Sequence, residues 1–392
     1  MSNSGYIRLL SWGLLCVLDK IRKSAGINLK DAETFFAQLT PKIQADLPGW
    51  YGSQAKLAGQ PTFHPRNWSF IFRYVVQVSE MESSAILVKV RHIEKMELSK
   101  AVVNEKMGLE AREEYETLKK LQSVFNTEGN SSLFFTIRPL ALYDDLNAVV
   151  MEEADLRTLR SFFRSPKMLM EGRARKTFEG YLELAGRWLR IFHDGNGSAG
   201  EGFIFDRSLY ENACTYLERI KPSLSQKDQS LLDDLLGKLY ETYHSKVVPY
   251  RILHEDFNSA NIFVTRDGKI CSFDPHNQPG PLYIDLAKII TDVETYRIQV
   301  ITNGLWVPYP RLQTFHAALL RGYFGSESVD HSELSLFRLL ILLEKWKEAE
   351  IRFESSKGKW KFLYSLAMPQ MRRYFLRLIQ KLISEKFQDI SL

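Results

Sequence analysis

The stretch RILHEDFNSANIFV, residues 251–264, decides how this sequence is interpreted. It places His254 two residues before Asp256, and Asn261 five residues after that aspartate. A short predicted hairpin then leads to Asp274. Phosphoryl transfer to a hydroxyl needs one carboxylate that accepts a proton and oxygen ligands that hold Mg²⁺. The spacing therefore predicts base and metal ligands on one rigid loop and hairpin.

These residues resemble the catalytic loop and metal-binding aspartate of the aminoglycoside phosphotransferase family, a branch of the protein-kinase-like fold. The segment 280–287, GPLYIDLA, resembles the Asp-Leu-Ala segment that follows in that family. The resemblance covers roughly residues 65–350. It implies an α+β, bilobal protein-kinase-like fold, in which a nucleotide binds between a small antiparallel-sheet lobe and a larger, mainly helical lobe.

The resemblance also implies a role for each residue. Asp256 would be the catalytic base, and Asn261 and Asp274 would bind Mg²⁺. Asp285 would anchor the catalytic loop, and His254 would shape it. The donor would be ATP or GTP. The acceptor would be a hydroxyl of a small molecule, such as a sugar, an amino sugar or a saccharide-containing metabolite.

Residues upstream fit the same scheme. Lys89 lies within an apolar strand pattern, ILVKV, and resembles the lysine that contacts the nucleotide phosphates. A lysine in such a strand needs a partner, and the following predicted helix offers Glu110, Glu113 and Glu114. The resemblance to the family implies Glu114, whose register is the most similar. The segment around Met151, Glu152 and Ala154 resembles the hinge whose backbone groups bind adenine.

The sequence departs from the family pattern at three places, one of which is the Pro-His pair that follows Asp274 where Phe-Gly is usual. Glu255 stands where a small or basic residue is usual, and HPRNWS at 64–69 replaces a glycine-rich loop. Backbone approach to the phosphates would then depend on Asn67 and its neighbours. Because of these departures, a catalytically inactive kinase-like binding or regulatory module stays an alternative.

A second alternative is a metal-dependent hydrolase. His254, Asp256, Asp274 and His276 form two mirrored pairs of good ligands for a transition metal. Asn261 has no role in that scheme, and His276 has none in the kinase scheme. The importance of His276 therefore distinguishes the two.

The periodicity predicts three regions: a helical extension at 1–46, a small nucleotide-binding lobe at 47–154 and a large catalytic and substrate-binding lobe at 155–392. Residues 47–67 are expected to be loop. The elements expected in the small lobe are strands at 68–78, 85–90, 134–142 and 147–151 and a helix at 105–125. In the large lobe the hairpin of 261–265 and 269–273 interrupts helices.

The composition of the chain bears on its binding partners and its location in the cell. The formal charge of +5 with 47 acidic residues gives no dense basic surface, so a nucleic-acid partner is not expected. Three dispersed cysteines suit neither a disulfide framework nor a zinc site, which favours a cytoplasmic protein. The amphipathic segments 5–23 and 371–383 either pack on the protein or make a peripheral contact with the cytoplasmic face of a membrane. The sequence predicts no oligomeric state.

Overall fold

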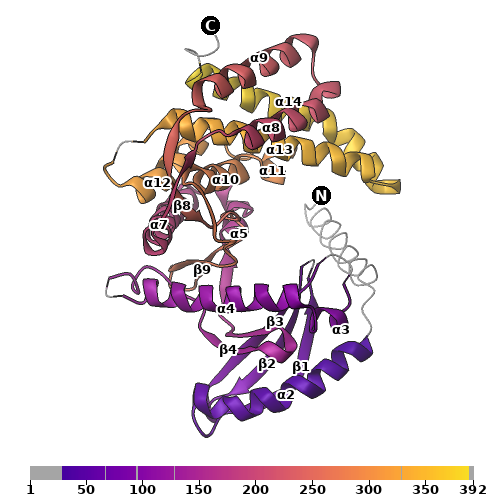
Figure 1. The fold of residues 1–392 in the computed structure, drawn as a ribbon, viewed down its shortest axis with the longest axis vertical. Coiled ribbons are helices and arrows are strands. Elements are labelled where there is room, and N and C mark those ends of the chain that lie inside the picture. The colour runs from indigo at the N-terminus through magenta and orange to yellow at the C-terminus, as the bar shows by residue number, and fades with distance from the viewer. Residues whose placement is uncertain (1–28, 67, 94–95, 128, 328, 388–392) are drawn as a thin grey trace. The chain divides into compact units, whose positions relative to one another are not determined.

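The computed structural model of the chain describes residues 29–66, 68–93, 96–127, 129–327 and 329–387 (Figure 1). The chain divides into two compact units. The first is Met1–Ser123 with Thr136–Asp155, and the second is Val124–Phe135 with Leu156–Leu392.

The first unit is built on a five-stranded antiparallel sheet with the strand order β1-β2-β3-β5-β4. Its strands are β1 (Lys56–Pro65), β2 (Ser69–Gln77), β3 (Ser83–Arg91), β4 (Pro139–Tyr143) and β5 (Ala148–Glu152). Its helices are α2 (Leu29–Tyr51), α3 (Leu98–Ala101), η1 (Asp144–Leu146) and α4 (Glu105–Phe125), whose last two residues belong to the second unit. The predicted β2–β3 hairpin and the helix at 105–125 are confirmed.

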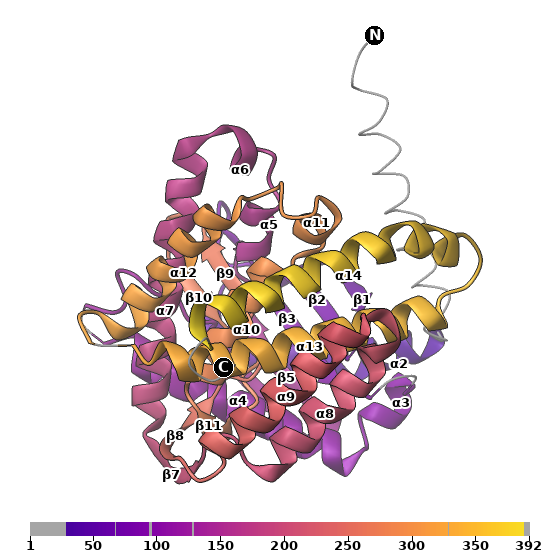
Figure 2. The same ribbon diagram turned by 90° about the horizontal axis from the view of Figure 1, so that it is seen from above.

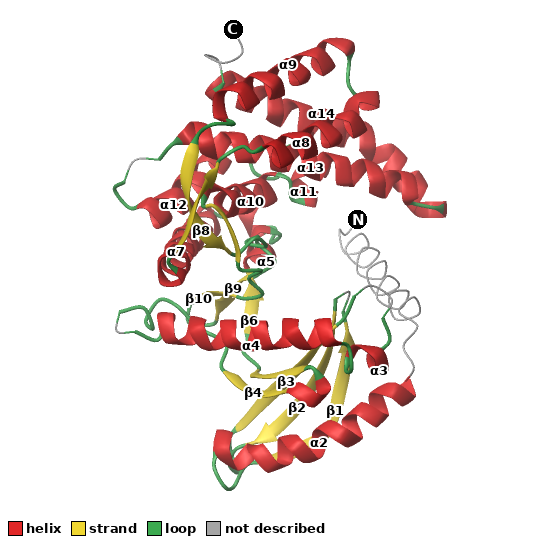
Figure 3. Cartoon of the chain, in the orientation of Figure 1, coloured by secondary structure: helices red, strands yellow, loops and turns green. Residues whose placement is uncertain are grey.

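Successive side chains of strand β3 point to opposite faces of the sheet, so the two faces contact different helices. Ile86, Val88 and Val90 are buried in a core shared with the apolar face of helix α2. Lys89 lies on the other face, where it meets helix α4. Figure 3 shows the two helices flanking the sheet. Helix α2 includes residues 29–46 of the segment expected as an extension and is thus part of the first unit.

The expectation that residues 47–67 form a loop is wrong. Residues up to Tyr51 continue helix α2, and Lys56–Pro65 pair with β2 as an edge strand. This strand contains Gly59 and Pro61 and a shift in register between Ala58 and Thr62. Glycine and proline are tolerated at sheet edges and bulges, so their presence hid the strand.

The second unit is larger and mainly helical, which together with the sheet of the first confirms the predicted α+β fold class. Its helices are α5 (Leu159–Phe163), α6 (Lys167–Met170), α7 (Gly172–Asn196), α8 (Arg207–Ile220), η2 (Lys221–Ser223), α9 (Gln226–Tyr243), α10 (Tyr283–Glu294), α11 (Arg297–Ile301), α12 (Tyr309–Phe324), α13 (His331–Ser355) and α14 (Gly358–Lys386). Two three-stranded sheets, β10-β9-β6 and β11-β8-β7, comprise β6 (Leu156–Thr158), β7 (Ser198–Phe203), β8 (Val247–Leu253), β9 (Ile262–Thr265), β10 (Ile270–Ser272) and β11 (Gln278–Pro281).

Helices α8, α9, α13 and α14 lie together in the second unit (Figure 2). The apolar residues of 371–383, including Phe375, Ile379 and Leu382, are buried there. The segment 5–23 lies outside the described residues. In the described ranges, no helix has both the length and the apolar content that a bilayer crossing needs.

Helices α7 and α12 cross at two glycines, which gives the first testable prediction. A Cβ on Gly322 would overlap the carbonyl oxygen of Glu183, and one on Gly186 would overlap that of Leu319. Because backbone atoms cannot rotate away, Gly322→Ala is expected to lower the free energy of unfolding by about 3 kcal/mol. Urea denaturation measures the change.

The matched control is Gly180→Ala, also within helix α7, where a Cβ would have nothing within 4 Å. Alanine favours the helix over glycine by about 0.5–1 kcal/mol, so this variant is expected to be slightly more stable than the parent protein. Equal effects of the two substitutions would contradict a close helix crossing at Gly322.

Candidate active site

Asp285 fastens the loop that follows strand β8. Its carboxylate is fully buried and accepts hydrogen bonds from the backbone N–H groups of His254 at 2.7 Å and Glu255 at 2.8 Å. His193 Nε2 lies 3.1 Å from the same carboxylate, and its Nδ1 lies 2.7 Å from the hydroxyl of Tyr323. Burial opposes ionisation, but the contacts with His193 and His254 keep the pKa of Asp285 below its ordinary value.

Asp256 projects from this loop between two asparagine amides. Asn261 Nδ2 donates to Asp256 Oδ2 at 2.5 Å, and Asn258 Nδ2 donates to Oδ1 at 2.6 Å. Both amides also donate to the carbonyl oxygen of Asp256. The carboxylate is thereby held in one orientation. With its nitrogen committed to Asp256, the Asn261 amide keeps its oxygen as the atom suited to a cation.

His254 is the structural centre of the loop. Its ring is fully buried beside Trp188, Phe192 and Phe257, and its Nε2 lies 2.8 Å from Ser272 Oγ. Ser272, on strand β10, also donates to the carbonyl oxygen of Asn261. The ring therefore ties the loop to the β9–β10 hairpin.

Burial of His254 gives a prediction on pH. Burial lowers the pKa of this ring to about 4, from 6.5 when it is exposed. Between these values the unfolded chain binds the proton and the folded chain does not, so stability is lost as pH falls from 6.5 to 4. The loss attributable to His254 is about 3 kcal/mol. Urea denaturation at several pH values measures it.

The difference in the pH dependence of stability between the parent protein and His254→Gln isolates the effect of His254. Other buried histidines, such as His316, act in the same direction in both proteins. The stability of His254→Gln is expected to depend less steeply on pH over this interval, whatever its stability at pH 7. His244→Gln, at an exposed position after helix α9, is the control and should leave the slope unchanged. An unchanged slope in His254→Gln would contradict a neutral buried ring.

Asp274 follows the hairpin in a left-handed backbone conformation, with φ of 64°. The preceding Phe273 stacks on Phe263 of β9 with ring centroids 4.2 Å apart, which fixes the point where the chain leaves the hairpin. Like Asp285 and Asp256, Asp274 acts electrostatically on the buried His254 ring. Three carboxylates thus act electrostatically on this one ring. A non-glycine residue with positive φ is strained, as is common at functional sites.

Glu255 and His276 form a pair of their own. His276 Nδ1 lies 3.3 Å from Glu255 Oε2, and this contact lowers the pKa of the Glu255 carboxyl. Lys288 of helix α10 donates to the carbonyl oxygen of Glu255, whose φ is 61°. The unusual residue between His254 and Asp256 therefore has specific partners.

The hydrolase ligand set is not assembled. His276 is directed to Glu255, while His254 is enclosed by aromatic rings. Within the described ranges, no group of three or more His, Cys, Asp and Glu side chains is placed to hold a metal ion.

A second clamp holds the other end of the loop, and the sequence interpretation missed it. Asp292 of helix α10 accepts from the backbone N–H of Ser259 at 3.0 Å and from its hydroxyl. Arg160 of helix α5 donates to Asp292 at 3.1 Å and to Ser259 Oγ at 3.2 Å. Asp292 lies seven residues after Asp285, two turns along the same helix face. This spacing of two aspartates is the sequence feature from which the second clamp could have been predicted.

In the first unit, Lys89 pairs with Glu114 as expected. Lys89 Nζ lies 2.8 Å from Glu114 Oε1, and their side chains are only 12% and 9% exposed. Arg91, two residues further along β3, binds the other carboxylate oxygen at 2.7 Å. One carboxylate on helix α4 thus pairs with two cations of the sheet. Arg91 was not singled out from the sequence.

The hinge candidates lie at the end of strand β5. Met151 is buried and pairs with Leu87, while the N–H of Glu152 donates to the carbonyl oxygen of Arg138 at 3.0 Å. Ala154 comes two residues beyond the strand. Asn67 lies outside the described residues.

The sequence lacks a glycine-rich loop between strands β1 and β2, and the structure describes the residues on either side of Asn67. Arg66 donates its N–H to the carbonyl oxygen of Ser69 at 2.8 Å, which closes the turn. His92 Nε2 lies 3.1 Å from the carbonyl oxygen of Arg66, and its ring stacks on Phe70. The end of the hairpin is thereby braced by strand β3 and the residue after it.

The first unit contains the pair of Lys89, on the third strand, with Glu114. The second unit contains the anchored loop of Asp256 and Asn261. The chain has a protein-kinase-like fold. No protein-family model matches its sequence, and no curated protein matches it.

Several solved structures are similar to the chain. A choline/ethanolamine kinase family protein from Mesorhizobium loti is 13% identical, with 91% of this chain and 97% of that chain covered and a TM-score of 0.47. The choline kinase LicA from Streptococcus pneumoniae is 14% identical, with 88% and 99% covered and a TM-score of 0.44. A glucosamine kinase is 13% identical, with 88% and 87% covered and a TM-score of 0.49.

Proposed function

We propose that this protein is a small-molecule kinase of the aminoglycoside phosphotransferase type. It transfers the γ-phosphoryl group of ATP or GTP to a hydroxyl of a sugar, an amino sugar or a saccharide-containing metabolite. The observation that carries the proposal is the Asp256 carboxylate, held between the amides of Asn258 and Asn261 on a loop clamped by buried Asp285. A loop held at this many points is preorganised for one reaction geometry.

Asp256 acts on the acceptor in this proposal. Its carboxylate accepts a hydrogen bond from the acceptor hydroxyl, orients the oxygen for in-line attack and takes its proton as the bond to phosphorus forms. The amides of Asn258 and Asn261 keep the carboxylate from rotating.

Asn261 and Asp274 would hold Mg²⁺, which neutralises phosphate charge when it is bound. The residues fit this role because the Asn261 amide directs its nitrogen to Asp256, leaving oxygen for a cation, and because Asp274 follows the β9–β10 hairpin at the end where Asn261 precedes it. Hard oxygen donors of this kind suit Mg²⁺ better than a transition metal.

Lys89 and the hinge would bind the nucleotide. Lys89 contacts the phosphates, and Glu114 holds the ammonium group in place. Met151, Glu152 and Ala154 provide the edge for the base. Since Glu152 N–H already bonds Arg138, the base would use other backbone groups there. The free thiols of Cys214 and Cys271 suit the reducing cytoplasm, where nucleoside triphosphates are abundant.

The test is transfer from γ-labelled ATP or GTP with Mg²⁺ to a panel of sugars, amino sugars and amino alcohols. Labelled acceptor formed together with an equal amount of nucleoside diphosphate is the expected result. Nucleotide binding without turnover for any acceptor would favour the inactive binding module instead. Phosphate ester hydrolysis that needs no nucleotide and is lost in His276→Ala would favour the hydrolase.

A further inference from the structure

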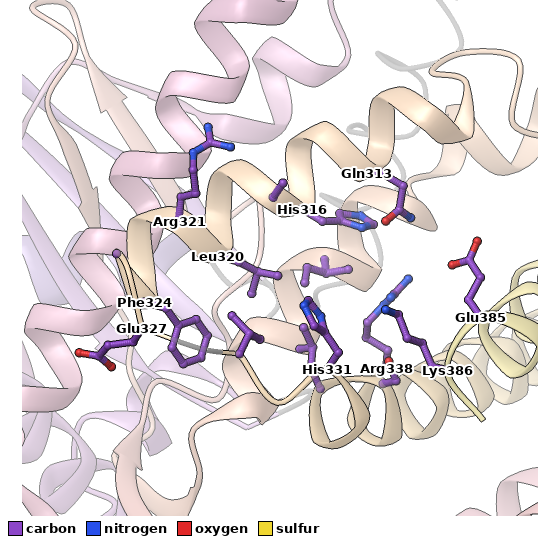
Figure 4. Close-up of a pocket in the computed structure, with 16 residues that line it drawn as sticks. Gln313, His316, Leu320, Arg321, Phe324, Glu327, His331, Arg338, Glu385 and Lys386 are labelled. Atoms are coloured by element: carbon purple, nitrogen blue, oxygen red, sulfur yellow. The ribbon is translucent and has the colours of Figure 1, made fainter. Parts of the chain in front are cut away.

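A cavity of about 290 Å³ lies within the second unit between helices α12 and α13, near the end of α14 (Figure 4). One part is apolar, formed by residues that include Ile290, Leu320, Phe324 and Leu334. The other part is polar, with Gln313 and His316 on α12 facing Arg338 on α13. The volume suits a small molecule with an apolar body and one polar group.

The polar part contains buried nitrogen atoms without hydrogen-bond partners among the described residues. They are Gln313 Nε2, His316 Nε2 and Arg338 Nε. His316 and Arg338 are 6% and 8% exposed. Buried polar groups are almost always paired because an unpaired one costs about 1–3 kcal/mol. An arginine Nε can only donate, so the missing partner is an acceptor.

The charge around the cavity favours an anionic acceptor. The two carboxylates that line the cavity are engaged, since Glu327 pairs with Arg190 and Glu385 accepts from Tyr309 at 2.9 Å. Glu294, fully buried next to Arg338, has one oxygen on that guanidinium and 3.6 Å from His316 Nε2, while its other oxygen makes no hydrogen bond with a described residue. Lys386, which lines the cavity, makes no ion pair with a described residue. Arg338 has one guanidinium nitrogen on Glu294 at 2.6 Å, and its Nε remains for a ligand. An incoming carboxylate would therefore find one cation without an ion pair to a described residue, Lys386, and one further N–H donor, Arg338 Nε.

The cavity is separate from the candidate active site. Asp285 and Asp292, which clamp the catalytic loop, lie on one face of helix α10. Ile290, which lines the cavity, lies on the opposite face at the helical spacing of 100° per residue. None of the catalytic-loop residues lines the cavity.

We propose that this cavity binds a small organic carboxylate with a compact apolar body. The carboxylate accepts from Arg338 Nε and Gln313 Nε2 and pairs with Lys386, while the apolar body lies against Leu320, Phe324 and Leu334. The inference does not depend on the proposed kinase activity.

Benzoate tests the proposal, with benzamide as its uncharged analogue. Titration calorimetry of the full chain is expected to show one benzoate site and at least about tenfold weaker binding of benzamide, the factor that one charged contact contributes. Inorganic phosphate, which lacks an apolar body, is expected to bind more weakly than benzoate.

Three variants locate the site. Ala317→Trp places a large ring at an exposed wall position of the cavity and is expected to abolish benzoate binding without unfolding the helix. Lys386→Met is expected to weaken it about tenfold, whereas Lys227→Met, an exposed lysine of helix α9, leaves it unchanged. Asp256→Asn also leaves it unchanged, which separates this site from the proposed active site.

Equal binding of benzoate and benzamide, or unchanged benzoate binding by Ala317→Trp, would overturn the proposal. Absence of any benzoate binding would overturn it too, and would leave water as the partner of the buried nitrogens. Thermal melting of each variant establishes that it is folded before it is titrated.

Discussion

Replacement of Asp256 by asparagine is expected to lower phosphoryl transfer by about a thousandfold or more, because an amide cannot take the proton of the acceptor hydroxyl. The substitution keeps the size of the side chain, and the oxygen of the new amide can still accept from Asn261, whose own oxygen then stays available for a cation. Affinity for the nucleotide should change little. Turnover of ATP with a substrate found in the acceptor screen, and separate titration of nucleotide binding, measure the two effects.

Asp267→Asn is the matched control, since this aspartate is exposed in the β9–β10 turn, where it accepts from Thr265 and pairs with Lys269. Its activity is expected to equal that of the parent protein. If Asp256→Asn retained a tenth or more of the parent activity while folded, Asp256 could not be the catalytic base.

Replacement of Asp285 by asparagine is expected to have the largest effect on stability. The buried carboxylate accepts from two backbone N–H groups and faces His193, and an amide would turn a donor toward at least one of them. Loss of a partner in a buried charged cluster costs about 3–5 kcal/mol. Urea denaturation at pH 7 measures the loss of stability. Turnover by the folded fraction should fall as well, because the loop at His254 and Glu255 is released.

Asp206→Asn supplies the comparison. Asp206 also accepts a backbone N–H, that of Leu209, but it does so as the N-cap of helix α8 and outside the buried cluster. Its replacement is expected to lower stability by less than about 1 kcal/mol, because asparagine is also a good N-cap. Comparable losses in both variants would mean that Asp285 acts only as an ordinary backbone cap.

Local patterns made the long helix and the hairpins predictable. Helix α4 begins and ends where the change to helical spacing placed it, at Glu105 and Phe125. The β9–β10 hairpin follows from an Asp-Gly turn between two apolar runs. The partner of Lys89 was predictable because a cation in an apolar strand needs a carboxylate within reach.

Contacts that depend on tertiary packing were not predictable. Ser272 joins His254 to Asn261 only because two strands bring them together, and nothing in its sequence context sets it apart from other serines. Arg160 reaches Asp292 across 132 positions of the chain. Edge strands such as β11, with the sequence QPGP, carry too few β-branched residues for recognition.

The double pairing of Glu114 has an evolutionary consequence. A carboxylate with two cationic partners tolerates the loss of either one. If Lys89 changed to a neutral residue, Arg91 would still hold Glu114, so no bare charge would be left beneath the sheet. A descendant of this protein could therefore lose Lys89 and keep this unit folded, with little selection against the intermediate on grounds of folding.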